Sequence, residues 1–377
     1  MQTKAALLTE MGKEKPYAQS QPLSIKTVEL AEPQKNEVLI KIGATGLCHS
    51  DLSVINGSRP RPMPMVLGHE ATGEVVQLGK DVEDFDVGDH VVCTFIPSCG
   101  KCLPCKEGRP ALCERGAKSN EQGEMLGGGY RLSSAEEDTI HHHLGVSGFS
   151  EYAVVSTHSI VKVDKSIPFE MVAIFGCAVI TGIGAVVNTA QVQAGSTVAV
   201  VGLGGIGLNA IMGAKLAGAS EIIALDINED KFDLAKSLGV TAVFNSGDDD
   251  VASAVKKYVQ GGVDYAFETA GVVPAMDVAY AITKRGGVTT TTGLPDPSHQ
   301  FSLPQVTLAA EERTIKGSYV GSCVPERDIP HFITLYNQKR LPVDTLLTDV
   351  ITLDDINEGF DRLDRGEAAR LVVKMPT

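Results

Sequence analysis

Four cysteines gathered in one short stretch of the 377-residue chain constrain its folding more than any other feature. They are Cys99, Cys102, Cys105 and Cys113. Repeated C-x-x-C spacing lets successive thiolates converge on one ion, and four thiolates complete a closed tetrahedral zinc shell. A closed shell leaves no position for a substrate, so we expect this zinc to brace a loop near residues 95–115. Disulfide pairing or a redox-active C-x-x-C is the alternative.

Composition argues against several classes of protein. The 33 basic and 47 acidic residues give a net charge of −14, which argues against a nucleic-acid binder. Residues 1–20 show no pattern typical of a secretory signal. The longest apolar run, about residues 198–214, is rich in glycine and predicts a buried strand and helix rather than a membrane span. Eight cysteines without an export signal indicate a reducing compartment, so we expect a cytoplasmic protein.

The length predicts two domains. Short strands punctuated by glycine and proline predict a β-rich first domain, with strands at 38–42, 74–78 and 90–93. The glycine- and charge-rich stretch 115–148 is predicted as a long surface loop. Its three consecutive histidines, His141, His142 and His143, are interpreted as loop side chains, because no matching ligand spacing surrounds them.

From about residue 197 strands and helices alternate, which predicts a parallel, doubly wound α/β sheet. The expected strands are 197–201, 221–225, 263–269 and 287–292, and the expected helices are 205–217 and 231–238. The sheet should end near residues 317–323. A final strand at 370–374 is expected to return to the first domain.

A glycine-rich turn follows the strand at 197–201 and opens the next helix. The G-x-G-x-x-G pattern alone is weak, but the preceding strand, the following helix and a later acidic residue supply the context of a dinucleotide site. Gly202 permits the tight turn, Gly204 lets the backbone approach a pyrophosphate, and Gly207 permits close helix packing. The helix N-terminus attracts phosphates. Glycines that serve only a packed turn are the alternative.

Asp226 ends the next strand and should accept hydrogen bonds from the adenosine ribose hydroxyls. Its carboxylate would repel a 2′-phosphate, and the residues that follow, Ile227 and Asn228, include no arginine. The sequence therefore predicts NAD rather than NADP as the cofactor.

Three further potential ligands lie outside the four-cysteine cluster: Cys48, His69 and Cys177. Two thiolates and one imidazole leave a fourth position open, which is the pattern of a catalytic zinc. Ligands so far apart in the sequence need a fold to unite them. The residues alone leave a buried, unliganded Cys177 as an equal alternative.

Five motifs occur in one order along the chain: TGLCHSDL at 45–52, GHEATGEV at 68–75, the four-cysteine segment, Gly176–Cys177 and the glycine turn at 202–207. With these motifs the chain resembles, from Lys4 to Lys374, the zinc-dependent alcohol dehydrogenases of the medium-chain dehydrogenase/reductase superfamily. The resemblance implies a GroES-like catalytic domain over 1–178 and 320–377, with a Rossmann NAD-binding domain over 179–319.

The resemblance also implies roles for individual residues. The catalytic zinc ligands are Cys48, His69 and Cys177, with Asp51 orienting His69 and Glu70 able to approach the metal. Ser50 hydrogen-bonds the substrate oxygen and starts the proton relay. The cofactor-binding positions are His49, Thr181, Gly202, Gly204, Gly205, Ile206, Gly207, Asp226, Lys231 and Arg370, and the substrate-pocket positions are Phe95, Leu294 and Tyr319. For most of these residues a helix cap, a core position or a solvated surface position is the ordinary alternative.

The activity that the resemblance implies is reversible, NAD-linked oxidation of primary alkyl or aromatic alcohols to aldehydes (EC 1.1.1.-, with 1.1.1.1 as the specific expectation). One of the two zinc ions per chain acts as a Lewis acid on the alkoxide, and the hydride goes to NAD. Ser53 stands where many relatives carry a relay histidine. The expected partners are a small alcohol or aldehyde and a second copy of the chain in a homodimer, with a tetramer also possible.

Two alternatives remain. The stretch 115–148 resembles that of the branch that includes glutathione-dependent formaldehyde dehydrogenases. However, Arg59 and Arg61 stand where that branch carries acidic residues that hold glutathione. This departure weakly suggests carboxylate-bearing substrates, although solvated surface arginines are the simpler interpretation. A non-catalytic NAD-binding structural protein is the alternative of another class.

Overall fold

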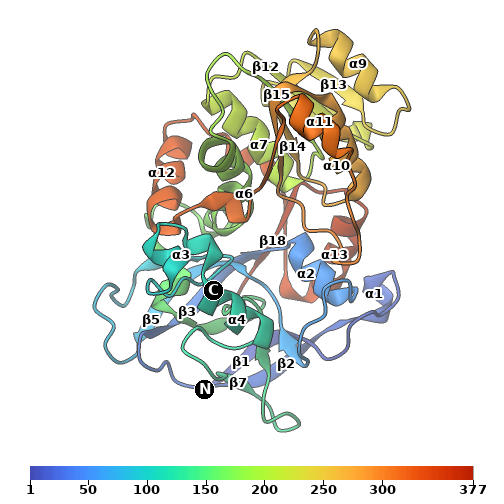
Figure 1. Ribbon diagram of the computed structural model, residues 1–377. Helices are drawn as coiled ribbons and strands as arrows, with labels where there is room; N and C mark the ends of the chain where they lie inside the picture. Colours follow the sequence, from blue (N-terminus) through green and yellow to red (C-terminus); the bar gives the residue numbers. More distant parts are fainter. Residues whose placement is uncertain (377) are drawn as a thin grey trace. The chain divides into compact units, whose positions relative to one another are not determined.

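The computed structural model describes residues 1–376 and forms two compact units (Figure 1). The first unit contains Met1–Cys177, Val324–Ile333 and the segment from Asp344 onwards, and the second contains Ala178–Cys323 and Thr334–Val343. The expected return segment, 320–377, differs in two places: residues 320–323 and 334–343 belong to the second unit. Within helix α12 (Pro325–Asn337), the assignment changes from the first unit to the second between Ile333 and Thr334.

Two β-sheets organise the first unit. The larger sheet has the strand order β10-β6-β5-β3-β18-β17, with β9 also paired to β3, and the smaller has the order β7-β2-β1-β4-β8. The final strand, β18, pairs antiparallel with β3, so the end of the chain returns to this unit as expected. The strands are β1 (Gln2–Leu8), β2 (Leu23–Leu30), β3 (Glu37–Gly46), β4 (Met65–Val66), β5 (Glu70–Leu78), β6 (His90–Cys93), β7 (Leu132–Ser133), β8 (His141–His142), β9 (Tyr152–Ser156), β10 (Ile160–Lys162), β17 (Leu347–Ile351) and β18 (Arg370–Lys374).

The helices of the first unit are short and join or cap the strands. The α-helices are α1 (Tyr17–Ser20), α2 (His49–Ile55), α3 (Leu103–Lys106), α4 (Glu114–Gln122), α5 (Phe169–Val172) and α13 (Ile356–Asp364). Single helical turns are η1 (Pro110–Leu112), η2 (Thr157–Ser159), η3 (Ala173–Gly176), η8 (Leu353–Asp355) and η7 (Val343–Leu346), of which only residues 344–346 belong to this unit. Helix α13 anchors α1, because the Asp361 carboxylate accepts hydrogen bonds from the backbone N–H groups of Tyr17 and Ala18, at 2.7 and 2.8 Å.

The stretch 115–148 is not the long surface loop that its composition predicts. It contains most of α4 as well as β7 and β8, and β7 and β8 extend the smaller sheet at its two edges. Met125, Leu132 and Ile140 are buried in a hydrophobic cluster with residues of β1 and β2. Two of the three consecutive histidines, His142 and His143, are buried as well. The prediction was wrong because these few apolar residues are spread thinly among glycines and charges, yet each packs against a preformed sheet.

The second unit is a six-stranded parallel sheet with the order β13-β12-β11-β14-β15-β16 (Figure 1). In chain order this is 3-2-1-4-5-6, the arrangement of dinucleotide-binding folds. Helix α7 lies on one face, while α9 and α10 pack on the other against Ala199, Val201, Ile223 and Leu225. The strands are β11 (Thr197–Val201), β12 (Glu221–Asp226), β13 (Ala242–Asn245), β14 (Val263–Glu268), β15 (Thr283–Thr291) and β16 (Thr314–Gly317). The helices include α6 (Ala178–Gly184), η4 (Ala185–Ala190), α7 (Gly205–Leu216), η5 (Glu229–Lys231), α8 (Phe232–Ser237), α9 (Val251–Tyr258), α10 (Val273–Ile282), α11 (Gln305–Ala310) and η6 (Val320–Ser322).

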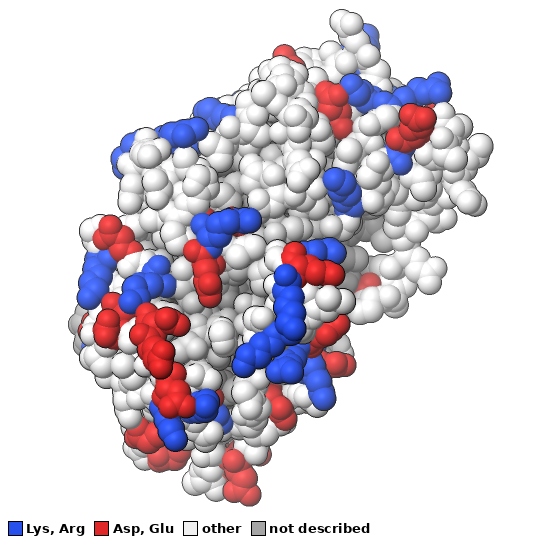
Figure 2. Space-filling view, turned by 60° about the vertical axis from the view of Figure 1, so that its left-hand side comes forward, with Lys and Arg blue, Asp and Glu red and all other residues white. Residues whose placement is uncertain are grey.

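The apolar run near 198–214 is the strand β11 followed by α7, as predicted. Within residues 1–376, no single helix is long and apolar enough to cross a membrane. One bent pair, Phe169–Gly176 with Ala178–Ala190, reaches the required length and composition, and its side chains are mostly buried. Figure 2 shows that basic and acidic side chains lie interspersed on one face of the molecule.

Candidate metal centres and coenzyme site

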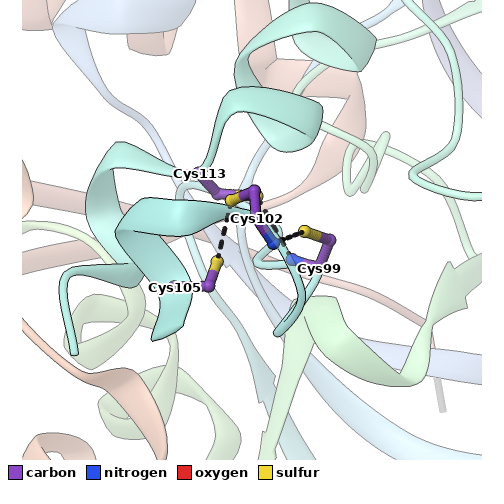
Figure 3. A group of neighbouring side chains, drawn as sticks. All are labelled: Cys99, Cys102, Cys105 and Cys113. Atoms are coloured by element: carbon purple, nitrogen blue, oxygen red, sulfur yellow. Dashed lines mark hydrogen bonds between the residues drawn. The ribbon is translucent and has the colours of Figure 1, made fainter. Parts of the chain in front are cut away.

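The four clustered cysteines form a compact group in the first unit (Figure 3). All four sulfur atoms lie within 4.8 Å of one another. The Cys102 sulfur is 3.4 Å from that of Cys105 and 3.8 Å from that of Cys113. Four sulfurs held at about 2.3 Å from a central zinc lie about 3.8 Å apart, so these positions suit a closed tetrahedral shell. None of the eight cysteines forms a disulfide bond.

Backbone N–H groups support negative charge in this cluster. The Cys113 sulfur accepts hydrogen bonds from the backbone N–H groups of Cys99 and Gly116, at 3.2 and 3.3 Å. A hydrogen bond from the backbone of Cys105 lowers the pKa of the Cys102 thiol to about 6. Burial raises the pKa of the Cys105 thiol to about 12. Four thiolates this close need a cation to balance their charge, and a zinc ion would supply it.

The second candidate metal centre draws on three separate segments of the first unit. Cys48 precedes the first turn of α2, His69 precedes β5, and Cys177 follows η3. Their ligand atoms, together with a carboxylate oxygen of Glu70, lie within 4.8 Å of one another, and all four side chains are buried. The structure therefore brings together the three residues that the sequence left apart.

These residues fit a zinc ion. The Nε2 atom of His69 is buried and has no hydrogen-bond partner among residues 1–376, although a buried imidazole nitrogen normally has one. Its other nitrogen, Nδ1, lies 3.3 Å from the Asp51 carboxylate. Two thiolates and one imidazole are ligands that zinc favours, and three protein ligands leave a fourth position for a substrate.

The charges of this cluster are coupled. A hydrogen bond from the Cys177 thiol, together with the nearby His69 ring, holds the pKa of Cys48 well below its usual value. Burial raises the pKa of Glu70 to about 8, although Arg370 opposes this shift from 3.1 Å away. Arg370 is therefore buried beside Glu70 within the first unit rather than exposed on the surface.

Asp51 has a second histidine neighbour that the sequence analysis missed. Its Oδ1 atom lies 3.0 Å from Nδ1 of His143, as well as near His69. Burial works against the charged carboxylate, but the two histidines hold the pKa of Asp51 well below its usual value. The available signal was the apolar setting of the histidine triplet, which Ile140 and Leu144 flank.

The structure also places the other predicted residues of the first unit. The Phe95 ring packs edge-on against His69, with centroids 4.9 Å apart. His49 and Ser50 lie in the first turn of α2, where His49 is exposed and Ser50 half-buried. The Ser53 hydroxyl donates a hydrogen bond to the His49 carbonyl at 2.8 Å. The two unexpected arginines, Arg59 and Arg61, are half-buried.

The glycine turn of the second unit has the geometry of a phosphate-binding turn. Gly202 has φ +100°, and a Cβ there would lie 2.8 Å from the backbone nitrogen of Ala270. A Cβ on Gly207 would collide with the Gly202 carbonyl, so close packing of α7 requires glycine. A Cβ on Gly204, by contrast, would meet no atom within 4 Å, so the backbone there is open to a ligand. Helix α7 begins at the next residue, Gly205, with its free N–H groups.

Asp226 connects the turn to the end of β12. One carboxylate oxygen accepts a hydrogen bond from the Leu203 backbone N–H at 2.6 Å, and the other accepts one from Asn228 at 2.9 Å. The ammonium group of Lys231 lies 3.2 Å from the carboxylate. The structure thus places Asp226 and Lys231 together at the carboxyl end of the sheet, where nucleotide ligands bind in such folds.

The other predicted positions of the second unit lie on separate elements. Thr181 is buried in α6, and Ile206 is half-buried in the first turn of α7. Leu294 is 46 % exposed after β15, and Tyr319 is half-buried just before η6.

Comparisons with known proteins define the class as a zinc-binding dehydrogenase. Residues 34–165 match the alcohol dehydrogenase GroES-like domain, and residues 205–338 match the zinc-binding dehydrogenase domain. An alcohol dehydrogenase zinc-binding domain protein from Burkholderia ambifaria is 34% identical, with a TM-score of 0.93 and full coverage of both chains.

Benzyl alcohol dehydrogenase from Acinetobacter calcoaceticus is 33% identical, again with a TM-score of 0.93 and full coverage of both chains. A zinc-binding dehydrogenase from Sinorhizobium meliloti, solved with NADP, is 26% identical, with a TM-score of 0.82 and 99% coverage of each chain. The chain belongs to the zinc-dependent alcohol dehydrogenase family of the medium-chain dehydrogenase/reductase superfamily. The predicted family and the GroES-like and Rossmann fold class are thereby confirmed.

Proposed function

We propose that this protein is an NAD-dependent zinc alcohol dehydrogenase that interconverts primary alcohols and aldehydes. The observation that carries the proposal is the convergence of Cys48, His69 and Cys177 around the partnerless Nε2 atom of His69. Such a donor set holds a catalytic zinc with one position left for a substrate, whereas the four-cysteine cluster would hold a second zinc that only braces its segment.

When bound, the zinc supplies Lewis acidity to an alcohol oxygen and the nicotinamide cofactor accepts the hydride. The chain's own residues orient groups and move the proton. Asp51 fixes the ring of His69 through Nδ1. Ser50, two residues after Cys48, takes the proton that leaves the alcohol. The hydroxyl of Ser53 donates a hydrogen bond to the His49 carbonyl, so water or another histidine rather than Ser53 carries the proton onward.

The proposed substrates are primary alcohols with aromatic or alkyl substituents. Phe95 places an apolar ring directly beside the ligand His69. The similarity to a benzyl alcohol dehydrogenase points to the same class of alcohol. Benzyl alcohol is the first substrate to test.

The proposed cofactor is NAD. The Asp226 carboxylate, held by Leu203 and Lys231, would accept hydrogen bonds from ribose hydroxyls and repel a 2′-phosphate. One similar structure contains NADP, so the preference of this chain requires its own measurement.

The test combines zinc analysis with kinetics. The purified protein should contain two zinc ions per chain and oxidise benzyl alcohol with NAD. Cys48→Ala should retain one zinc and the circular dichroism of the parent, but lose turnover. Wild-type activity in this variant would exclude Cys48 from the centre. Faster turnover of S-hydroxymethylglutathione than of benzyl alcohol would support a glutathione-dependent formaldehyde dehydrogenase instead.

A further inference from the structure

One backbone N–H group and two imidazole nitrogens lie around one carboxylate oxygen of Asp51. Oδ1 accepts a hydrogen bond from the Gly68 backbone at 3.0 Å, and it lies 3.3 Å from Nδ1 of His69 and 3.0 Å from Nδ1 of His143. In the part of the chain that the structure describes, the other oxygen, Oδ2, and Nδ1 of His143 are both buried without a well-aligned hydrogen bond, so His143 meets Oδ1 as a close polar contact. Asp51 and both histidines are at least 97 % buried. Protein groups on one side therefore fix the orientation of this carboxylate.

His143 reaches Asp51 from a segment that contributes none of the proposed zinc ligands. The parallel pairing of β8 with β4 sets His141 beside Met65 and His142 beside Val66. The residue after β8 therefore lies next to the turn that carries His69. The rings of His69 and His143 are 5.6 Å apart and nearly perpendicular, at 77°.

We propose that His143 is a positioning residue for His69 and that it acts through Asp51. This inference rests on the proposed function, in which His69 is a zinc ligand. An ionised carboxylate only accepts hydrogen bonds, so it attracts the N–H side of both rings. His143 and the Gly68 N–H hold Oδ1 in place, and Oδ1 in turn directs Nε2 of His69 toward Cys48 and Cys177.

Removal of His143 leaves the buried Asp51 charge with one imidazole neighbour and lets the carboxylate rotate. Metal-ligating histidines lose metal more readily when the partner of their second nitrogen is disturbed. An additional metal bound by Asp51, His69 and His143, whose ligand atoms also lie within 4.8 Å of one another, is the competing explanation. It would require His69 to bind two metal ions through its two nitrogens at once.

The experiment compares four single variants in the zinc-loaded, full-length protein. His143→Phe keeps a ring but no N–H group, and His143→Gln places its amide near the former Nε2 position, away from Asp51. His143→Asn restores an N–H group near the Nδ1 position. His142→Phe changes a neighbouring histidine that is equally buried but is not in contact with Asp51. The time course of zinc release to a chromophoric chelator is measured for each variant. The kinetic phase that is missing in Cys48→Ala is assigned to the proposed catalytic site.

We expect His143→Phe and His143→Gln to speed that phase about tenfold or more, the usual scale for loss of a group behind a metal ligand. His143→Asn should recover most of the loss. His142→Phe should lower the melting temperature without changing this phase, and release from the four-cysteine site should stay the same in all four variants. Either His143→Phe or His143→Gln suffices if the other does not fold.

Three results would overturn the inference: unchanged release in the His143→Phe and His143→Gln variants, equal acceleration by His142→Phe, or a third zinc ion per chain. The absence of any release phase that depends on Cys48 would instead contradict the proposed function itself.

Discussion

Arg370 and Glu70 form a buried ion pair, with Nη1 of the arginine 3.1 Å from Oε1 of the glutamate, although 300 positions separate them in the sequence. The pairing of β18 with β3, which also pairs with β5, brings the two residues together. Arg370 was expected to bind a cofactor phosphate. Through its contact with Glu70, Arg370 also stabilises the first unit. A residue that only bound phosphate would not need this contact.

Arg370→Met should therefore lower the free energy of unfolding by about 1–3 kcal/mol, because it removes the hydrogen-bond partner of the buried Glu70 carboxyl. Glu70→Gln added to Arg370→Met should cost less than the sum of the two single changes, by about 0.5–3 kcal/mol. Denaturant unfolding of all four zinc-loaded proteins measures this coupling. Strictly additive losses would show that the two side chains do not stabilise each other.

Cys105→Ala should remove one zinc ion per chain and lower the melting temperature, since metal binding contributes to folding of the segment around the four cysteines. The matched control is Cys93→Ala, at a buried cysteine whose sulfur belongs to none of the three candidate metal groups of the described chain. The control should keep both zinc ions. Metal analysis and thermal unfolding test this prediction. Two zinc ions per chain in Cys105→Ala would show that the cluster is not a closed four-thiolate site.

Asp226→Asn should narrow the preference for NAD over NADP, because it removes the negative charge that would repel a 2′-phosphate. The amide oxygen can still accept the hydrogen bond from Leu203, so the turn should persist. Asp230→Asn, an exposed acidic residue in the following helical turn, is the control and should leave the ratio unchanged. The ratio of kcat/KM for the two cofactors is the measurement. A wild-type ratio in Asp226→Asn would exclude charge at Asp226 as the source of the preference.

The features that were predictable from the sequence are those with local causes. The spacing of the four cysteines and the glycine turn at 202–207 are set within a few residues, and the structure has both. The strands at 90–93, 197–201 and 370–374 have the predicted bounds. The assignment of Cys177 to the candidate metal centre required the fold, because nothing near this residue in the sequence shows that η3 ends beside Cys48 and His69.

The contact between His143 and Asp51 was not predictable for the same physical reason. It depends on the path of residues 115–148, and the apolar contacts that fix that path are with strands from other parts of the chain. Burial of a polar residue by distant strands leaves only a weak local pattern. The histidine triplet was therefore interpreted as a set of loop side chains, although two of its members are almost inaccessible.

His142 should make the protein less stable at mildly acidic pH. Its Nε2 atom accepts a hydrogen bond from the Arg131 backbone N–H at 3.0 Å, so the ring must stay neutral on that nitrogen. Burial, with a smaller contribution from the Arg131 charge, lowers the pKa of His142 to about 3. The unfolded chain takes up this proton near its ordinary pKa of about 6.5. Between these values the unfolded state binds more protons, so stability falls as the pH falls.

In His142→Gln the amide oxygen can accept the same hydrogen bond without titrating. Below pH 6.5 the wild type should therefore lose stability faster than this variant, by up to about 1.4 kcal/mol per pH unit, the value for one proton. Denaturant unfolding between about pH 6.5 and 5 tests the difference, and His331→Gln, at an exposed histidine, should follow the wild type. Parallel curves for the wild type and His142→Gln would mean that His142 takes up its proton in the folded protein, and the hydrogen bond to Arg131 would then not hold the ring neutral.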